Sequence, residues 1–293
     1  INYSGDCSSS DTSADADNNT ITFNVLSEGP HSNCRISVTS SGVTSDNLSV
    51  DNFTIDITAP SVSSFTMSDT AIKVGETATV QLVLSEAVIS FSSSADITAP
   101  NGTLSTMSSS DNITWSGTFT PSSNTEDSTN TLSLSTSYTD TAGNSGPAAT
   151  TANYEVETLA PSVNSFTMSD TALKIGDNAT VTLVFSEAVI SFSSSADITV
   201  PNGALSTMTS SDNITWSGTF TPSSNAEDSS NRLSLATSYT DTAGNSGSAA
   251  TTANYAVDTR APTLSEVTAV TTPTSDNTPN YTFSSNESGT ITY

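Results

Sequence analysis

Residues 78–84 read Ala78-Thr79-Val80-Gln81-Leu82-Val83-Leu84, and within them apolar side chains recur at every second position. Successive side chains of a β-strand point to opposite faces, so this alternation predicts a strand with Val80, Leu82 and Leu84 on one face. The same pattern returns downstream, between turn residues. It covers Ile113, Trp115 and Phe119, then Leu132 and Leu134, then Tyr154 and Val156.

Further strands are predicted at 62–67, 88–91 and 104–107, separated by glycine, proline and asparagine clusters. No stretch shows helical periodicity of useful length. About seven short antiparallel strands in about 100 residues are typical of an immunoglobulin-like sandwich. We therefore predict an all-β chain of tandem immunoglobulin-like β-sandwiches in a linear rod, with Trp115 and Trp216 in the cores. Disorder is the alternative for a Ser/Thr-rich acidic chain, but the strand pattern argues against it.

The sequence contains a near-exact internal repeat. Residues 60–160 align without a gap with residues 161–261, at an offset of 101. Pro60, Pro161 and Pro262 occupy the same point of three successive copies. Proline fixes φ at each joint, so we expect limited bending there. The repeat predicts complete modules at 60–160 and 161–261, and a third module that begins at Pro262.

The two ends of the sequence resemble the two parts of one further module. Residues 1–59 close with Asp51-Asn52-Phe53-Thr54-Ile55-Asp56, which is similar to the last strand of a complete module. Ile1-Asn2-Tyr3 at the start matches Ile291-Thr292-Tyr293 at the end. We therefore predict that 1–59 is the C-terminal part of a hybrid module and that 262–293 is the N-terminal part of the next one. Preceding and following copies would complete both parts head to tail, either within one giant chain or between identical subunits that exchange strands.

The charge balance excludes several classes of partner. The chain carries 30 acidic and 5 basic side chains, a formal net charge of −25. Nucleic acids and anionic membrane surfaces both need a basic patch, so neither is expected as a partner. No apolar run approaches the ~18 residues that span a bilayer, and no membrane insertion is expected. The sequence begins without an initiator methionine or a signal peptide, and we interpret it as a window from a longer protein.

The two cysteines, Cys7 and Cys34, lie 27 residues apart. They form no CxxC motif and have no neighbouring histidine, so metal ligation is not expected. A disulfide that closes a modest loop is the favoured interpretation, and it implies an oxidising compartment. Two buried free thiols are the alternative, although Cys7 lies in a polar run.

No residue pattern predicts catalysis. Two neighbouring carboxylates could act as acid and base, and Glu126 with Asp127 is the clearest such pair. We expect this pair in a Ser/Asn-rich loop without an apolar pocket, and it recurs as Glu227 and Asp228. His31 lies in a predicted turn and is expected to be exposed. One histidine and two cysteines leave little room for a zinc site or a catalytic triad, so the chain is predicted not to be an enzyme.

Several motifs recur in each complete module. In the first they are Phe65-Thr66-Met67-Ser68-Asp69-Thr70-Ala71-Ile72-Lys73-Val74-Gly75-Glu76-Thr77-Ala78-Thr79-Val80, Leu84-Ser85-Glu86-Ala87-Val88, Thr118-Phe119-Thr120-Pro121 and Tyr138-Thr139-Asp140-Thr141-Ala142-Gly143-Asn144. Together they resemble the bacterial Ig-like repeats of very large surface adhesins and biofilm proteins. This resemblance covers both complete modules. It implies an extracellular stalk or fibre at the cell surface, often rigidified by calcium.

The hybrid module resembles a second repeat type of such proteins. The resemblance depends on Val270-Thr271-Thr272-Pro273-Thr274-Ser275-Asp276-Asn277-Thr278-Pro279, Gly289-Thr290-Ile291-Thr292-Tyr293, Cys7-Ser8-Ser9-Ser10 and Ser32-Asn33-Cys34. The hybrid module departs from the pattern at Val38-Thr39-Ser40-Ser41-Gly42-Val43, where Asp-x-Ala-Gly-Asn would be expected. Calcium is therefore not expected there, and we interpret the disulfide as a substitute staple.

Calcium is the cofactor we expect, because hard cations bind several carboxylate and carbonyl oxygens and acidic residues recur at the offset of 101. No EF-hand or nonapeptide motif fixes the ligands. Acids near module ends could meet across a joint, where cations would offset the self-repulsion of the chain. The alternative is that these residues form turns or are solvated. The candidate ligands are Asp56, Asp69, Glu86, Asp96, Asp140, Asn144, Glu157, Asp170, Glu187, Asp197, Asp241, Asn245 and Asp258.

The sequence favours a structural function: a repeat segment of a long extracellular fibre or adhesin stalk that provides reach and stiffness. Near-identical tandem modules suit a spacer, because added units lengthen an object without creating new surfaces. Two alternatives stay open. The chain could be a module that binds glycans or a receptor through its loop ends, or an accessory region of a secreted enzyme.

Overall fold

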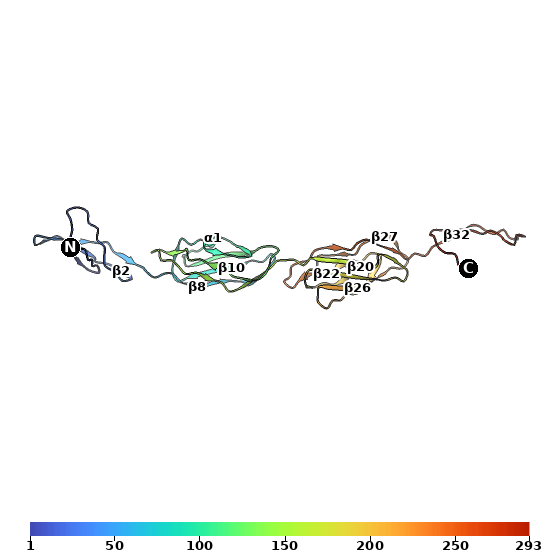
Figure 1. Cartoon of the computed structure of the whole chain (residues 1–293), viewed down its shortest axis with the longest axis horizontal. Helices are drawn as coiled ribbons and strands as arrows, with labels where there is room; N and C mark the ends of the chain where they lie inside the picture. Colours follow the sequence, from blue (N-terminus) through green and yellow to red (C-terminus); the bar gives the residue numbers. More distant parts are fainter. Residues whose placement is uncertain (293) are drawn as a thin grey trace. The chain divides into compact units, whose positions relative to one another are not determined.

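The computed structural model describes residues 1–292, which form short β-strands and two four-residue helices, so the all-β prediction is confirmed. Neither helix has the length or the apolar character needed to cross a membrane. The chain divides into two compact units, residues 1–157 and residues 158–293 (Figure 1). The first unit holds the disulfide-bearing hybrid part and one complete module; the second holds the other complete module and the hairpin that follows it.

One sheet of the first complete module contains the strand that was predicted from the alternation in residues 78–84. Val80, Leu82 and Leu84 of this strand are all buried. The register places Leu82 opposite Phe65 on one neighbouring strand and opposite Trp115 on the other. In order across the sheet, the strands are β13 (Gly102–Leu104), β14 (Thr114–Pro121), β10 (Ala78–Leu84) and β8 (Val62–Met67).

The other strands of this module form three smaller sheets. In one of them the last strand, β19, lies between β15 and β9, antiparallel to β15 and parallel to β9. A single helical turn, α1 (Ser93–Asp96), precedes β12. The strands are β9 (Ala71–Lys73), β11 (Val88–Ile89), β12 (Ile97–Thr98), β15 (Glu126–Asn130), β16 (Ser133–Leu134), β17 (Thr139–Asp140), β18 (Ala149–Thr150) and β19 (Tyr154–Glu157).

The core of the module is dominated by aromatic rings. Phe119, Tyr138 and Tyr154 are fully buried, and the rings of Phe119 and Tyr154 meet edge to face at 5.2 Å. Trp115 is only half-buried; it packs against the margin of the core, with its ring 4.7 Å from that of Phe91. The predicted core residues Trp115 and Trp216 thus both pack against their cores but only at the margin, and buried tyrosines occupy the centre. Their hydroxyls can be buried because each finds a carbonyl acceptor, as Tyr154 does at Pro100.

The predicted loop around Glu126 and Asp127 is wrong. Both residues lie in β15, where Glu126 pairs with Glu157 and Asp127 with Val156. The polar composition led to the wrong prediction because β15 has only one buried residue, Asn130, and therefore shows no alternation of apolar side chains. The carboxylate pair is thus part of a sheet, and Asp127 accepts a hydrogen bond from the backbone N–H of Thr129 at 2.9 Å.

The second complete module repeats this topology, as its near-identical sequence requires. Its four-stranded sheet again has the alternating strand, β22, at the centre, and Phe220 and Tyr255 reproduce the edge-to-face pair at 5.1 Å. Its elements are β20 (Val163–Met168), β21 (Ala172–Lys174), β22 (Ala179–Phe185), β23 (Val189–Ile190), α2 (Ser194–Asp197), β24 (Ile198–Thr199), β25 (Gly203–Leu205), β26 (Thr215–Pro222), β27 (Glu227–Asn231), β28 (Ser234–Leu235), β29 (Thr240–Asp241), β30 (Ala250–Thr251) and β31 (Tyr255–Asp258).

The hybrid part at the N-terminus has little apolar core. The predicted disulfide joins Cys7 and Cys34, both buried, with a Cα–Cα distance of 5.3 Å. His31 is buried rather than exposed, because its ring stacks on Phe53 at 5.5 Å and its Nε2 lies 2.8 Å from the carbonyl oxygen of Ser27. The strands are β1 (Asn2–Ser4), β2 (Gly29–His31), β3 (Arg35–Ser37), β4 (Thr39–Ser40), β5 (Val43–Thr44), β6 (Leu48–Ser49) and β7 (Phe53–Ile55).

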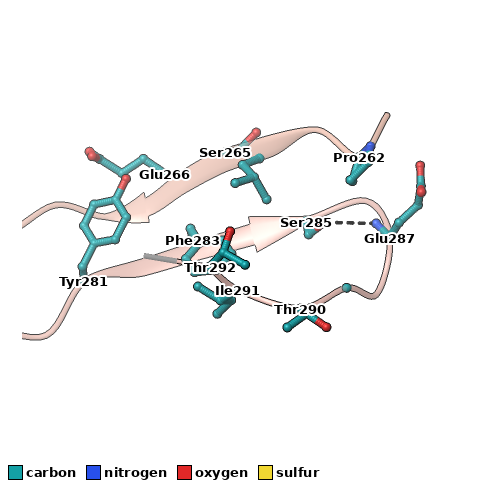
Figure 2. A pocket seen from close by; sticks show the side chains of 12 residues that line it. Pro262, Ser265, Glu266, Tyr281, Phe283, Ser285, Glu287, Thr290, Ile291 and Thr292 are labelled. Carbon is teal, nitrogen blue, oxygen red and sulfur yellow. Dashed lines mark hydrogen bonds between the residues drawn. The ribbon is translucent and has the colours of Figure 1, made fainter. Parts of the chain in front are cut away.

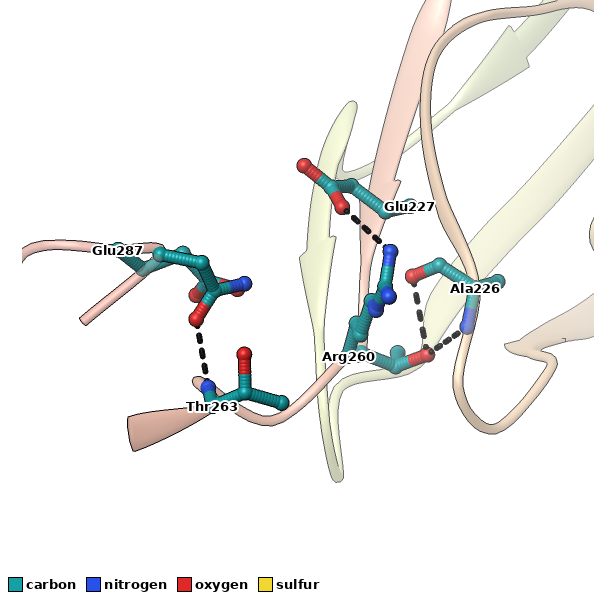
Figure 3. Close-up of polar contacts among 7 residues, drawn as sticks. Ala226, Glu227, Arg260, Thr263 and Glu287 are labelled. Carbon is teal, nitrogen blue, oxygen red and sulfur yellow. Dashed lines mark hydrogen bonds and ion pairs between the residues drawn. The ribbon is translucent and has the colours of Figure 1, made fainter. Parts of the chain in front are cut away.

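A two-stranded hairpin follows the second complete module. It consists of β32 (Leu264–Thr268) and β33 (Thr282–Ser285). Where the chain leaves the module, Arg260 lies 3.5 Å from Glu227, and the backbone N–H of Thr263 donates to the side chain of Asn286 (Figure 3). The ion pair is about half exposed, so it stabilises this junction only weakly. Tyr293, which the predicted hybrid module includes, lies outside the described residues.

Candidate metal centre

Three of the predicted ligands meet where the hybrid part leads into the first complete module. Asp56, Glu86 and Asp140 each place one carboxylate oxygen within 4.8 Å of the other two. Asp56 follows β7, Glu86 follows β10, and Asp140 ends β17. Because Val88 pairs with Asp140, the turn that carries Glu86 lies beside the end of β17. Three strands that are far apart in the sequence thus deliver the three carboxylates to one point.

Asp140 is held by the turn that follows it. Its Oδ1 accepts backbone N–H groups from Ala142, Gly143 and Asn144 at 2.8, 2.7 and 2.9 Å. Gly143 has a φ of +96°, a conformation that glycine adopts without steric cost. Desolvation raises the pKa of Asp140, but the hydrogen bonds from Asn144, Gly143 and Ala142 outweigh it and lower the pKa overall. Asp140 is therefore anionic at neutral pH.

The amide of Asn144 connects this turn to the strand that enters the module. Its Nδ2 donates to Oδ2 of Asp140 at 2.8 Å and to the backbone oxygens of Asp56 at 3.1 Å and Thr58 at 3.4 Å, and Thr58 is the equivalent of Leu159 at the offset of 101. The second module repeats the arrangement: Nδ2 of Asn245 donates to Oδ2 of Asp241 at 2.8 Å and to the backbone oxygen of Leu159 at 3.5 Å. Each complete module thus uses the same asparagine to hold the residues that lead into it.

The electrostatics of the cluster favour a cation. The pKa of Glu86 is raised by desolvation, and then by the neighbouring charges of Asp56, Asp140 and Glu28. Glu28 was not among the predicted residues, because it lies in the hybrid part, outside the repeat; its carboxylate accepts the hydroxyl of Thr58 at 2.7 Å. Several hard oxygen donors around one point suit Ca²⁺, which takes 6–8 oxygen ligands. The residues present fit such an ion.

Other predicted ligands satisfy local backbone groups instead. Asp69 accepts the N–H of Ala71 at 3.0 Å, and Asp170 repeats this bond in the second module. Asp96 is buried at the end of α1, where it accepts the N–H of Ser92 at 2.7 Å and the hydroxyl of Ser137. Asp197 takes the same place at the end of α2. Among the described residues, these four aspartates are not part of the three-carboxylate cluster, and each accepts hydrogen bonds within its own module.

The remaining predicted ligands are equivalents of the cluster in the repeat. The offset of 101 relates Asp56, Glu86 and Asp140 to Glu157, Glu187 and Asp241, and it relates Glu157 in turn to Asp258. Glu157 ends β19, Glu187 follows β22, and Asp258 is exposed at the end of β31. Asp241 is buried in its turn, as Asp140 is.

Substitution of Asn144 by alanine is expected to weaken the attachment of the entering strand. It removes hydrogen bonds to a carboxylate and to a backbone carbonyl, so we expect a loss of about 1–3 kcal/mol in the stability of the first module. Proteolysis around the exposed residues 57–59 should accelerate. Asn153→Ala is the matched control, because Asn153 donates one bond to Ser128 away from the joint. Equal proteolysis of the two variants would contradict the attachment role.

The comparison with protein families agrees with the two complete modules. The family model for a bacterial Ig-like domain matches residues 56–156 and again residues 157–257. A search among curated proteins finds no match. Similar solved structures include FdeC, an Escherichia coli adhesin, with a TM-score of 0.32 and 12% identity over 81% of this chain and 76% of that one. Another is invasin, a bacterial integrin-binding protein, with a TM-score of 0.30 and 14% identity over 83% of this chain and 48% of that one.

Proposed function

The chain belongs to the family of bacterial Ig-like domains, and from this premise we propose that it is a segment of an extracellular stalk or fibre, of the kind that carries adhesins at a bacterial cell surface. Its function is to provide reach and stiffness. Two near-identical modules in tandem support this proposal, because repetition adds length while presenting the same surface again.

The observation that carries the proposal is the asparagine at each joint. Asn144 and Asn245 both reach back to the backbone of the residues that lead into their module, across 86 residues of sequence in each case. A flexible tether between modules would not need such bonds. A stalk does need them, because every free joint shortens the mean distance between its ends.

Small-angle X-ray scattering tests this function directly. The wild-type chain is expected to give the large maximum dimension of a stiff tandem, and the double variant Asn144→Ala/Asn245→Ala a smaller one. Asn153→Ala/Asn254→Ala is the matched control, since both residues donate to the carbonyl of a strand residue within a module, Ser128 of β15 and Ser229 of β27. Equal dimensions for all three proteins would contradict a stiffening role, and specific binding of the chain to a glycan array would instead support a recognition module.

We further propose that calcium rigidifies the joint at Asp56, Glu86 and Asp140. A bound cation would relieve the repulsion among three carboxylates that lie within 4.8 Å of one another. Calcium at millimolar concentration is therefore expected to raise the unfolding temperature of the first module, and a chelator to reverse the rise. Magnesium should act more weakly, because it demands a stricter octahedral geometry. A melting curve unchanged between calcium and chelator would refute this part of the proposal.

Glu86→Gln separates ion binding from simple charge relief. The folded-state pKa of Glu86 is raised, so protonated Glu86 stabilises the fold, and this contribution is lost as the pH rises through that pKa. In chelator at pH 7 the variant is expected to melt at or slightly above the wild-type temperature. In calcium it should melt below the wild type, because a ligand is missing. Glu155→Gln, an exposed glutamate of β19 in the same module, should behave as wild type in both conditions.

A further inference from the structure

The hairpin after the second module exposes an apolar side that equivalent strands bury. All five residues of β32 are exposed, and Leu264 and Val267 are 67% and 60% accessible. At an offset of 202 they correspond to Val62 and Phe65 of β8. Phe65 is only 7% accessible and Val62 packs against the module core. Within residues 1–292, the hairpin therefore has the first strands of a module without the strands that cover them in a complete one.

The complete modules show which strands lie beside the equivalent pair of strands. There, β10 pairs with β8 on one edge and with β14 on the other, and β13 follows β14. β33 pairs with β32 as β10 does with β8, and within residues 1–292 no strand is paired to the other edge of β33. Figure 2 shows the side chains of Phe283 and Ile291 close together on one side of this hairpin. Tyr281 and Ile291, which border the same groove, are 55% and 57% accessible.

The hybrid part at the N-terminus holds the counterparts of the missing strands. Residues 20–26 precede β2 as β14 precedes β15, and Ile21, Phe23 and Val25 alternate along them. Phe23 forms a bridge to Ser9, which stands beside this segment as β13 stands beside β14. Val25 is fully exposed, so the segment has an apolar residue without cover.

The sheet that contains the last strand of each complete module independently gives the same correspondence between the hybrid part and a complete module. In each complete module the last strand pairs antiparallel with one neighbour and parallel with a strand from between the first two, as β19 does with β15 and β9. β7 pairs with β2 in the same antiparallel way, and the described residues place no strand on its other edge. The missing parallel neighbour corresponds to the segment between β32 and β33.

We propose that the hairpin docks residues 1–55 of a second copy of this chain. Residues 20–26 of the second copy add to the free edge of β33, and its β7 adds in parallel to the segment between β32 and β33. The union reproduces the strand order of a complete module and continues both existing sheets by edge addition. It also covers Leu264 and Phe283, which line the exposed groove. The proposal rests on the stalk function for its biological role, since repeated docking lengthens the fibre from head to tail.

Light scattering on the full chain and two shortened chains tests the docking. The full chain is expected to associate reversibly, with an average mass that rises with concentration. Chains of residues 1–261 and of residues 60–293 keep both complete modules but only one docking half each, so each alone should be monomeric. Mixed in equal amounts, they should form one 1:1 complex, with slower hydrogen exchange in β32 and β33.

A point variant in the full chain avoids any effect of shortening. Leu264→Asp is expected to weaken association at least tenfold without changing the melting of the complete modules, because it places a charge in the groove that Phe283 and Ile291 also line. Ile175→Asp is the matched control, an apolar residue 71% exposed on a complete module. Self-association that survives the loss of residues 1–59 would overturn the proposal. A full chain that stays monomeric would also overturn it, if an excess of the chain of residues 1–261 leaves the hydrogen exchange of β33 unchanged. Neither result changes the dimensions measured by small-angle X-ray scattering, so neither contradicts the stalk function.

Discussion

Replacing Phe119 with alanine is expected to lower the unfolding temperature of the first complete module sharply, while that of the second module stays unchanged. Phe119 is fully buried, and its ring lies 5.2 Å from that of Tyr154 and against the backbone of Gly102. A buried Phe→Ala substitution costs about 3–5 kcal/mol, through lost transfer free energy and the cavity left behind. Domains have about 5–15 kcal/mol of stability in total, so this loss approaches the whole reserve of a module with a lean core.

The duplication of the modules supplies the control. Phe220→Ala makes the same change in the second module, where Phe220 packs on Tyr255 at 5.1 Å. Calorimetry of each variant should resolve two transitions, one near the wild-type temperature and one lower by more than about 10 °C, since 1 kcal/mol shifts the Tm of such a domain by about 4–8 °C. A single cooperative transition that moves as a whole would contradict the view that each module has its own core.

Removal of the disulfide is expected to unfold the hybrid part selectively. In residues 1–59 the two half-cystines are the buried apolar side chains, while Phe23 and Phe53 are only half-buried. A core this small depends on its covalent link, and loss of a native disulfide from a small domain costs about 2–5 kcal/mol. Cys7→Ala/Cys34→Ala should therefore lose hydrogen-exchange protection in β1, β3 and β7.

The complete modules provide the internal reference, because neither contains cysteine. Their melting should be the same in the variant, in the wild type and in the wild type treated with a reductant. The reductant should reproduce the exchange pattern of the variant in the hybrid part. Protection that persists in β3 after reduction would show that its strand pairing is sufficient without the link.

The fold could be predicted closely wherever side chains alternate. The alternation of Val80, Leu82 and Leu84 predicted both the strand and its buried face, because a period of two residues is typical of a β-strand with one buried face. β15 was missed because its side chains are polar on both faces. Backbone pairing with β19 holds it in the sheet, and no local sequence pattern indicates such a pairing. Tyr154 was predicted through its alternation with Val156, but Tyr138 was not predicted as a core residue, because a hydroxyl signals exposure until its carbonyl acceptor is known.

The candidate site shows the same division between local and long-range information. The repeat indicated Asp56, Glu86 and Asp140 among several candidates. Only the fold shows that these three converge, while Asp69 caps its own turn and Asp96 accepts hydrogen bonds from Ser92 and from the distant Ser137. The bond from Asn144 to the backbone of Asp56 spans 88 residues, a distance over which sequence carries no sign of contact. His31 was misplaced for the same reason: its partner, Phe53, lies on a strand 22 residues away.

The parallel pairing of β9 with β19 determines how a module responds to tension. β9 lies near the start of the module and β19 at its end, so a pull on the two ends of the chain draws these parallel strands in opposite directions along their axes. The hydrogen bonds between Ala71–Lys73 and Glu155–Glu157 are then loaded together in shear rather than broken one at a time by unzipping. Both complete modules have this pair, because β21 and β31 repeat it.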